Sequence, residues 1–171
     1  MRRMLLLAAS ATFAAAFVGV GVARADTALT VGSGWQGFSW VGQTQPVVPT
    51  QTPFTFTTTL PVVLKITDVL CPGEVFTVYD NAVLVGQTSA PGLTTCDYAN
   101  STGDPTTALS DPNYSGGVAA LKAGTHSITI IVTTAPYPEG GGYIRIDAVG
   151  PTAYVSAQGG GARYLQVKKF H

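Results

Sequence analysis

Carboxylates are the residues of this sequence that could do chemistry. Glycoside hydrolases use two carboxyl groups on either side of a cleft, one as acid and one as base or nucleophile. Most acidic residues here stand in turn sequences such as TGDP and SDPN, where an aspartate caps the local backbone. The sequence therefore favours turn chemistry over catalysis. The candidates are Asp68, Glu74, Asp80, Asp97, Asp104, Asp111, Glu139 and Asp147.

The same carboxylates suggest a second chemistry, because Ca²⁺ takes oxygen ligands from loops. Three of them bracket one predicted hairpin, and two more lie in a long loop that a cysteine fastens nearby. EF-hand-like spacing is absent from the sequence. Calcium is therefore an alternative, and no other metal or cofactor is expected. The candidate ligands are Asp68, Glu74, Asp80, Asp104 and Asp111.

Histidines decide whether a nucleophilic enzyme is plausible, because a serine or cysteine nucleophile needs a base. The sequence offers only His126 and the terminal His171. His126 falls on the inward face of a predicted strand just after a turn, so we expect a hydrogen-bonded histidine at the edge of the core. The GxSxG and HExxH motifs are also absent. These observations favour a protein that is not an enzyme.

Five aromatic residues do not fit the interiors of the predicted strands. Such side chains stack on sugars or contact proteins when they lie on a surface. Tryptophans near the start of a domain more often fill the core, so two of the five have a structural alternative. The candidate ligand-contact residues are Trp35, Trp40, Tyr98, Tyr114 and Tyr137.

Residues 1–25 have the features of a secretory signal peptide. Arg2 and Arg3 precede an apolar stretch, and Ala23-Arg24-Ala25 fits the cleavage rule. A transmembrane anchor is the rival interpretation, but the stretch is rich in Ala and Gly and leads directly to the cleavage pattern. We expect a secreted, extracellular protein with no membrane span after cleavage.

Two cysteines, Cys71 and Cys96, would then meet an oxidising compartment, and we predict that they form one structural disulfide bond. Cleavage would also leave the chain acidic. Nine Lys and Arg less three in the signal gives six, against nine Asp and Glu, a net charge near −3. That charge argues against nucleic acid as a partner and leaves glycans and extracellular proteins. The oligomeric state is open.

Short alternating runs of apolar and polar residues follow residue 26, punctuated by Gly, Pro, Asn and Asp. They predict an all-β fold without helices, a single antiparallel β-sandwich of jelly-roll-like topology, with a closed barrel as the alternative. The sandwich is expected over residues 26–157, and residues 158–171 form a Gly-rich linker with a basic tail or a last strand. Residues 91–117 are predicted to be a long loop. The predicted strands include residues 54–57, 62–67, 75–79, 83–85, 118–121, 125–133 and 143–149.

The hairpin EVFTVYDNAVLVGQTS, residues 74–89, turns at Asp80-Asn81. A type I′ turn would place Ala82 at positive φ, so we expect a bulged or longer loop beginning at Asp80. Glu74 follows Pro72-Gly73 at the start of the strand and is expected to be solvated.

Several motifs together resemble those of poorly characterised secreted bacterial β-sandwich proteins, many of which carry a PEP-CTERM sorting tail. The motifs are PGEVFTVYDN, LVGQTS, LKAGTHSI and GGGYIRID, within residues 54–149. The group often has Gly where this chain has Ala82, and no PEP-CTERM tail follows here. The resemblance implies a sandwich and no catalytic residues. Weaker similarities exist to CUB domains and to carbohydrate-binding modules.

Three functions follow as hypotheses. The first is a secreted, non-enzymatic β-sandwich for extracellular or cell-surface interaction. The second is a carbohydrate-binding module, and the third is the carboxylate-based glycan hydrolase.

Overall fold

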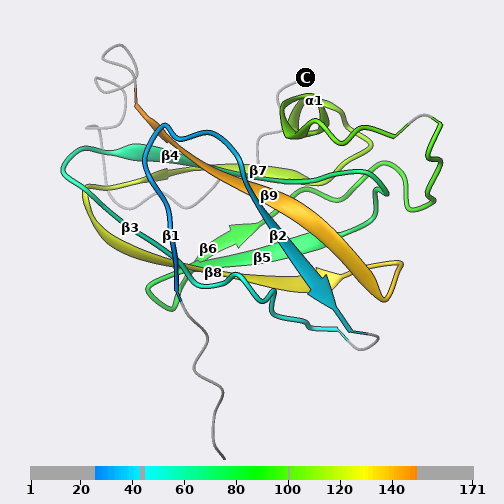
Figure 1. The fold of residues 1–171 in the computed structure, drawn as a ribbon, viewed down its shortest axis with the longest axis horizontal. Helices are drawn as coiled ribbons and strands as arrows, with labels where there is room; N and C mark the ends of the chain where they lie inside the picture. Colours follow the sequence, from blue (N-terminus) through cyan, green and yellow to red (C-terminus); the bar gives the residue numbers. More distant parts are fainter. Residues whose placement is uncertain (1–25, 43–44, 100, 150–171) are drawn as a thin grey trace, which may run out of the picture.

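The computed structural model describes residues 26–42, 45–99 and 101–149. Two β-sheets pack face to face, as the strand arrangement in Figure 1 shows, which confirms the predicted β-sandwich. The predicted signal peptide, the end of the predicted domain after residue 149 and the tail with His171 lie outside the described residues. The elements are β1 Thr27–Ala28, β2 Gln36–Val41, β3 Phe54–Thr58, β4 Val62–Asp68, β5 Val75–Asp80, β6 Val83–Gln87, α1 Pro105–Ser110, β7 Gly116–Leu121, β8 Gly124–Thr134 and β9 Glu139–Ala148.

The strand order is that of a jelly roll. One sheet has the order β1-β3-β8-β5-β6 and the other the order β2-β9-β4-β7. Four antiparallel pairs are nested in the chain, with β5–β6 innermost, then β4–β7, β3–β8 and β2–β9. Pairing of β5 with β8 and of β4 with β9 rolls this long ribbon into two sheets.

Side chains that alternate along the strands form the core between the sheets. Burial of each large apolar side chain stabilises the fold by roughly 1.5–3 kcal/mol, because its surface is removed from water. This burial is the main contribution that holds the two sheets together. Trp40 and Phe38 of β2 join this core and pack edge-on against Phe76 of β5. The largest buried apolar side chains are Trp40, Phe54, Phe76, Leu64, Ile66, Ile128, Ile130, Ile144, Ile146, Val62 and Val132.

Gly140 of β9 lies where the indole of Trp40 crosses the strand. A Cβ at this position would overlap the Trp40 ring and lie 2.9 Å from Glu74 Oε1. The first glycine of the sequence GGGYIRI therefore leaves room for the large indole of Trp40 to pack directly against the backbone of β9.

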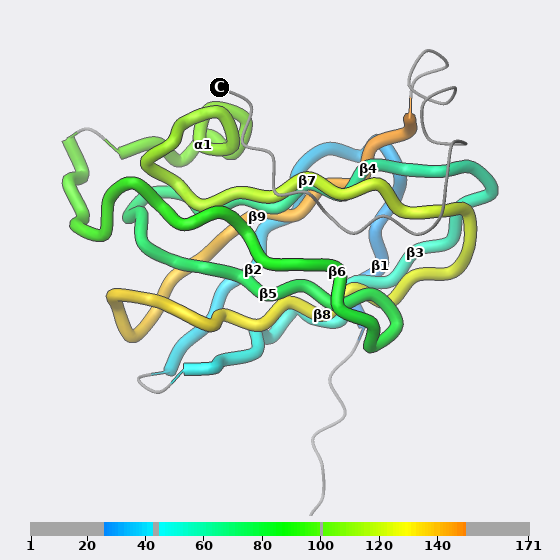
Figure 2. Tube along the Cα trace, turned by 180° about the vertical axis from the view of Figure 1, so that it is seen from behind, coloured from blue at the N-terminus to red at the C-terminus, as the bar shows by residue number. Residues whose placement is uncertain are grey.

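The prediction that the fold has no helices was wrong, because the long loop contains the short helix α1. Asp104 caps it: its Oδ2 accepts a hydrogen bond from Thr107 N at 2.8 Å, and Pro105 occupies the first turn. The hydrogen bonds from Thr107 hold the pKa of Asp104 below its usual value. The sequence Asp-Pro carries this helix-start signal. Figure 2 shows α1 at one end of the sandwich, and it packs on β4 and β7 of the four-stranded sheet.

The prediction for the hairpin turn was also wrong. Asn81 has φ 48° and Ala82 has φ 63°, and Asp80 pairs directly with Val83. This is the two-residue turn with both central residues at positive φ. Contacts with β8 hold it, since Asn81 Nδ2 donates to Thr125 O at 2.9 Å and Asn81 N donates to Ser127 O at 3.0 Å. The irregularity of the pairing lies farther along, between Val78 and Tyr79.

The disulfide bond between Cys71 and Cys96 is confirmed. It joins the segment after β4 to the long segment that precedes α1. No helix in the described ranges is long and apolar enough to cross a membrane.

Candidate functional site

A groove of about 490 Å³ lies on the outer face of the four-stranded sheet. Phe38 and Ile144 point into the core, so their neighbours Gly37 and Tyr143 face outward by the alternation of a strand. The groove is bounded on one side by the segment between β2 and β3, and on the other by residues that follow β4 and precede α1. Its lining is Gly37, Phe38, Ser39, Gln51, Val69, Leu70, Gly103, Gly141, Gly142 and Tyr143.

The floor of the groove is low because glycines replace side chains there. Gly141 pairs with Ser39 of β2, and a Cβ added to Gly141 would meet only Phe38 O, at 3.2 Å. The side chain that is missing at Gly141 would project into the groove. A glycine here therefore leaves open a space that any larger residue would occupy.

The walls of the groove carry an amide, a hydroxyl and an aromatic ring. Gln51 Oε1 accepts a hydrogen bond from Ser39 N at 3.0 Å, and Gln51 Nε2 lies 3.4 Å from Ser39 Oγ. Tyr143 is half-buried, with its ring against Gly37 and the small cluster of Val69, Ala108 and Tyr114 under α1. Within the part of the chain that the structure describes, the lining contains no Asp, Glu, His, Lys or Arg side chain.

A charged cluster lies beside the groove on the same face of the sheet. Lys65 Nζ is 2.9 Å from Asp147 Oδ2, and Arg145 Nε donates to Asp147 Oδ1 at 2.6 Å. Partial burial would raise the pKa of Asp147, but hydrogen bonds from Lys65 and Arg145 outweigh it and lower the pKa. Asp147 is therefore ionised at neutral pH.

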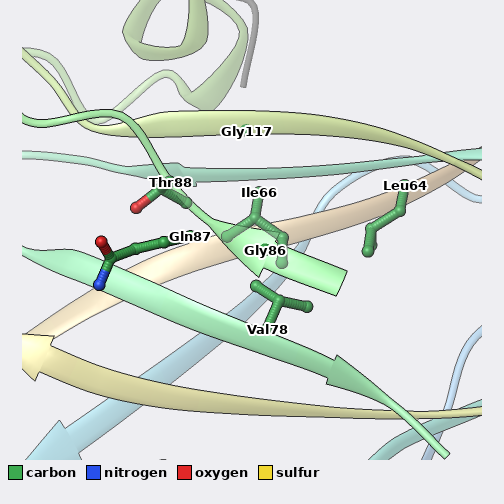
Figure 3. Close-up of a pocket in the computed structure, with 7 residues that line it drawn as sticks. All are labelled: Leu64, Ile66, Val78, Gly86, Gln87, Thr88 and Gly117. Carbon is green, nitrogen blue, oxygen red and sulfur yellow. The ribbon is translucent and has the colours of Figure 1, made fainter. Parts of the chain in front are cut away.

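Two other hollows are less suited to a ligand. Figure 3 shows an apolar space between the sheets toward which Leu64, Ile66 and Val78 turn, with a volume of about 10 Å³. That volume holds at most one water molecule. A shallow hollow of about 710 Å³ lies beside the hairpin, and the residues that line it come from β5, β8 and the turn. These elements form a single open surface without facing walls.

The predicted ligand-contact aromatics lie in different environments. Trp40 and Tyr114 are each only 2% exposed, so neither ring is a surface platform. The hydroxyl of Tyr137 accepts a hydrogen bond from Cys96 N, and Tyr98 is exposed on its loop. Trp35 is half-buried beside the charged cluster, where Arg145 Cζ lies 5.9 Å from the centre of its ring.

The candidate calcium ligands are separated. Asp104 and Asp111 flank α1, and Asp80 binds His126. Only Asp68 and Glu74 lie together, and nowhere in the described ranges do three or more His, Cys, Asp or Glu residues meet in an arrangement that could hold a metal ion.

Glu74, which we expected to be solvated, is 2% exposed, and Asp68 is fully buried. Asp68 accepts hydrogen bonds from Val69 N at 2.8 Å and Gly73 N at 3.1 Å. Burial raises the pKa of Asp68, and the nearby Glu74 raises it further, to about 9. Burial also raises the pKa of Glu74. Neither carboxyl group is accessible to a substrate.

His126 is confirmed as a hydrogen-bonded histidine at the edge of the core. Its Nδ1 lies 2.7 Å from Asp80 Oδ2 and its Nε2 lies 3.0 Å from Lys122 O, while its ring stacks on Phe56. Asp80 also accepts from Ser127 N at 3.3 Å. This pair anchors the hairpin to β8, which goes beyond the turn chemistry predicted for Asp80.

Sequence reasoning missed the groove. Gly141, Gln51 and Tyr143 were not among the candidate residues, and the only signal for the floor was the glycine run before YIRI. Comparison of the chain with protein-family models, with curated proteins and with solved structures gave no match. The groove is therefore the feature of the described structure that indicates a function.

Proposed function

We propose that the protein is a secreted, non-enzymatic β-sandwich that binds a glycan in the groove over Gly141. The observation that carries this proposal is the lining of the groove, a glycine floor with an aromatic ring, an amide and a hydroxyl around it. Sugars combine apolar C–H faces, which pack on aromatic rings, with hydroxyl groups, which exchange hydrogen bonds with amides and hydroxyls. A concave site with a few polar groups matches that chemistry.

The same lining argues for binding rather than turnover. Glycosidases bring two carboxyl groups into contact with the scissile bond, and the described residues that line this groove include no carboxylate. The closely paired carboxyl groups of Asp68 and Glu74 are buried instead, where a glycan chain cannot reach them. Extracellular location is part of the proposal, and its support is the signal-like N-terminus together with the disulfide bond.

The test is binding to soluble plant, fungal and bacterial polysaccharides, neutral and acidic, measured by retardation in affinity gel electrophoresis. We expect at least one polysaccharide to retard the purified protein without being degraded. Gly141→Leu should weaken that binding by about tenfold or more, equivalent to about 1.4 kcal/mol, because the new side chain fills the groove. Tyr143→Phe should weaken it less, because it removes only the hydroxyl.

The matched control is Ala120→Leu, which places the same leucine side chain at an exposed position of β7 on the same sheet. Thermal melting of each variant establishes that it is folded. No retardation by any polysaccharide, or equal retardation of Gly141→Leu and the wild type, would contradict the proposal. Release of reducing sugars from the polysaccharides would show turnover and contradict the non-enzymatic assignment.

A further inference from the structure

We propose that the glycan bound in the groove is acidic, and that Arg145 binds its carboxylate or sulfate group. This inference rests on the proposed glycan-binding function and adds the class of ligand and the residue that selects it.

Arg145 stands directly beside the groove. It follows Tyr143 by two residues on β9, so both side chains lie on the outer face of the sheet, about 7 Å apart along the strand. An extended glycan lying on Tyr143 therefore reaches Arg145 within one or two sugar units. Among the described residues, the lining of the groove offers no charged partner, and Arg145 is the cation that lies nearest along β9.

The guanidinium group of Arg145 is held in place before any ligand arrives. Its Nε donates to Asp147, and its Cζ lies over the ring of Trp35. Trp35 is fixed in turn, because its Nε1 donates to Thr106 Oγ1 of α1 at 3.1 Å. Stacking on an aromatic ring and one ion pair restrict an arginine side chain, so binding an anion costs less conformational entropy.

The terminal nitrogens of Arg145 are available to a ligand. The side chain is 33% exposed, and within the described ranges only Nε has a hydrogen-bond partner. The two free NH₂ groups can bind a carboxylate or sulfate through two parallel hydrogen bonds, which a lysine cannot reproduce.

Charge in this cluster favours an anion although the domain is acidic. Residues 26–149 contain three Lys and Arg against nine Asp and Glu, and two of the three cations, Lys65 and Arg145, meet here. They face one carboxylate, Asp147, which the lowered pKa keeps ionised. Two positive charges and one negative charge leave one positive charge without compensation at the end of the groove.

The experiment compares polysaccharides that share a backbone and differ in charge. Polygalacturonate and its methyl ester test a carboxylate, and dextran sulfate and dextran test a sulfate. We expect the wild type to bind the charged member of one pair at least tenfold more tightly. Arg145→Gln should remove this preference while leaving weak binding of the neutral member, and Arg145→Lys should restore only part of it. Lys122→Gln, which removes the one cation of residues 26–149 that lies outside the cluster, is the matched control and should bind as the wild type does.

Equal binding of the charged and neutral members, or an unchanged preference in Arg145→Gln, would overturn the inference. If Gly141→Leu still abolished polysaccharide binding in that case, the proposed glycan-binding groove would stand and only the proposed selectivity for acidic glycans would be wrong. If no polysaccharide bound at all, the proposed function and the inference would fall together. If Arg145→Gln lowered the melting temperature and weakened binding of the charged and the neutral polysaccharide equally, Arg145 would have a structural role. That result would also overturn the inference.

Discussion

The carboxyl groups of Asp68 and Glu74 form a buried pair at the end of β4. A lone ionised carboxylate in such a place costs several kcal/mol, so the pair holds a proton that either residue would lose in water. Asp68 also accepts backbone hydrogen bonds from Val69 and Gly73, which shape the segment leading to the disulfide bond and to β5. The protonation of the Asp68–Glu74 pair is therefore coupled to the stability of the segment between β4 and β5.

We expect the free energy of unfolding to fall as the pH rises from about 5 to about 9. In the unfolded chain the pKa of the Asp68 carboxyl group is near 3.8, whereas in the folded protein burial and the nearby Glu74 raise this pKa to about 9. Between these values the folded state binds more protons, so stability is fully present below the lower value and is lost as the pH rises through the upper one. The slope is about 1.4 kcal/mol per pH unit for one extra proton. Urea denaturation across this range measures it.

Asp68→Asn and Glu74→Gln each remove one titrating group of the pair and should flatten this slope. Glu139→Gln changes an exposed carboxylate at the start of β9 and should keep the wild-type slope. Stability that stays constant or rises between pH 5 and 9 in the wild type would count against the protonated pair.

At the scale of elements, the β5–β6 hairpin shows how tertiary contacts override a local preference. An alanine at φ 63° costs about 1–2 kcal/mol relative to a right-handed conformation. The turn keeps this conformation because Asn81 is hydrogen-bonded to β8 and because Asp80 is paired with His126. The hairpin is thus positioned by the sheet it joins.

Replacing Ala82 by glycine should stabilise the protein by about 1 kcal/mol, because glycine adopts positive φ without the steric cost of a Cβ. The midpoint of urea denaturation measures the change. Ala120→Gly, in an exposed strand position, is the matched control and should destabilise by roughly 0.5–1 kcal/mol. A lower midpoint for Ala82→Gly would show that the turn does not strain Ala82.

For the whole molecule, the disulfide bond joins the two segments that bound one side of the groove. Val69 and Leu70 line the groove directly before Cys71, and Gly103 lines it in the segment that follows Cys96. Neither cysteine belongs to a strand of the jelly roll, so the bond takes no part in the nested strand pairs. Cutting the bond should therefore loosen the groove wall and lower stability without changing the fold.

Reduction of Cys71–Cys96 should lower the free energy of unfolding by roughly 3 kcal/mol, as expected for a closed loop of this length. It should also weaken polysaccharide binding, because Leu70 and Gly103 lose a fixed separation. Melting curves and gel retardation with and without reductant measure the two effects. In the Cys71→Ser, Cys96→Ser double variant, reductant should change neither, and an unchanged wild-type melting temperature would contradict the role of the bond.

Part of the fold was predictable because its signals are local. Alternation placed Phe54, Phe56, Ile128 and Ile130 in the core, and the cysteine pair was the simplest disulfide in an oxidising compartment. Helix α1 was missed although Asp104-Pro105 is a recognisable helix start. Burial of Glu74 could not be predicted, because it depends on Trp40 and Gly140 from distant strands.

The sequence by itself determined that this chain forms an all-β fold, since the period of two in its apolar residues gives each strand one buried face wherever the strand is placed. The structure decided between the two predicted forms of that fold, because its strands form two separate sheets and not one closed barrel. Only the tertiary structure decided what the exposed faces contain. Gly141, Gln51 and Leu70 form one groove, and Trp35, Lys65 and Arg145 meet beside it, because β2, β9 and β4 are neighbours in one sheet. Strand order is fixed by long-range pairing, and no local pattern in the sequence records it.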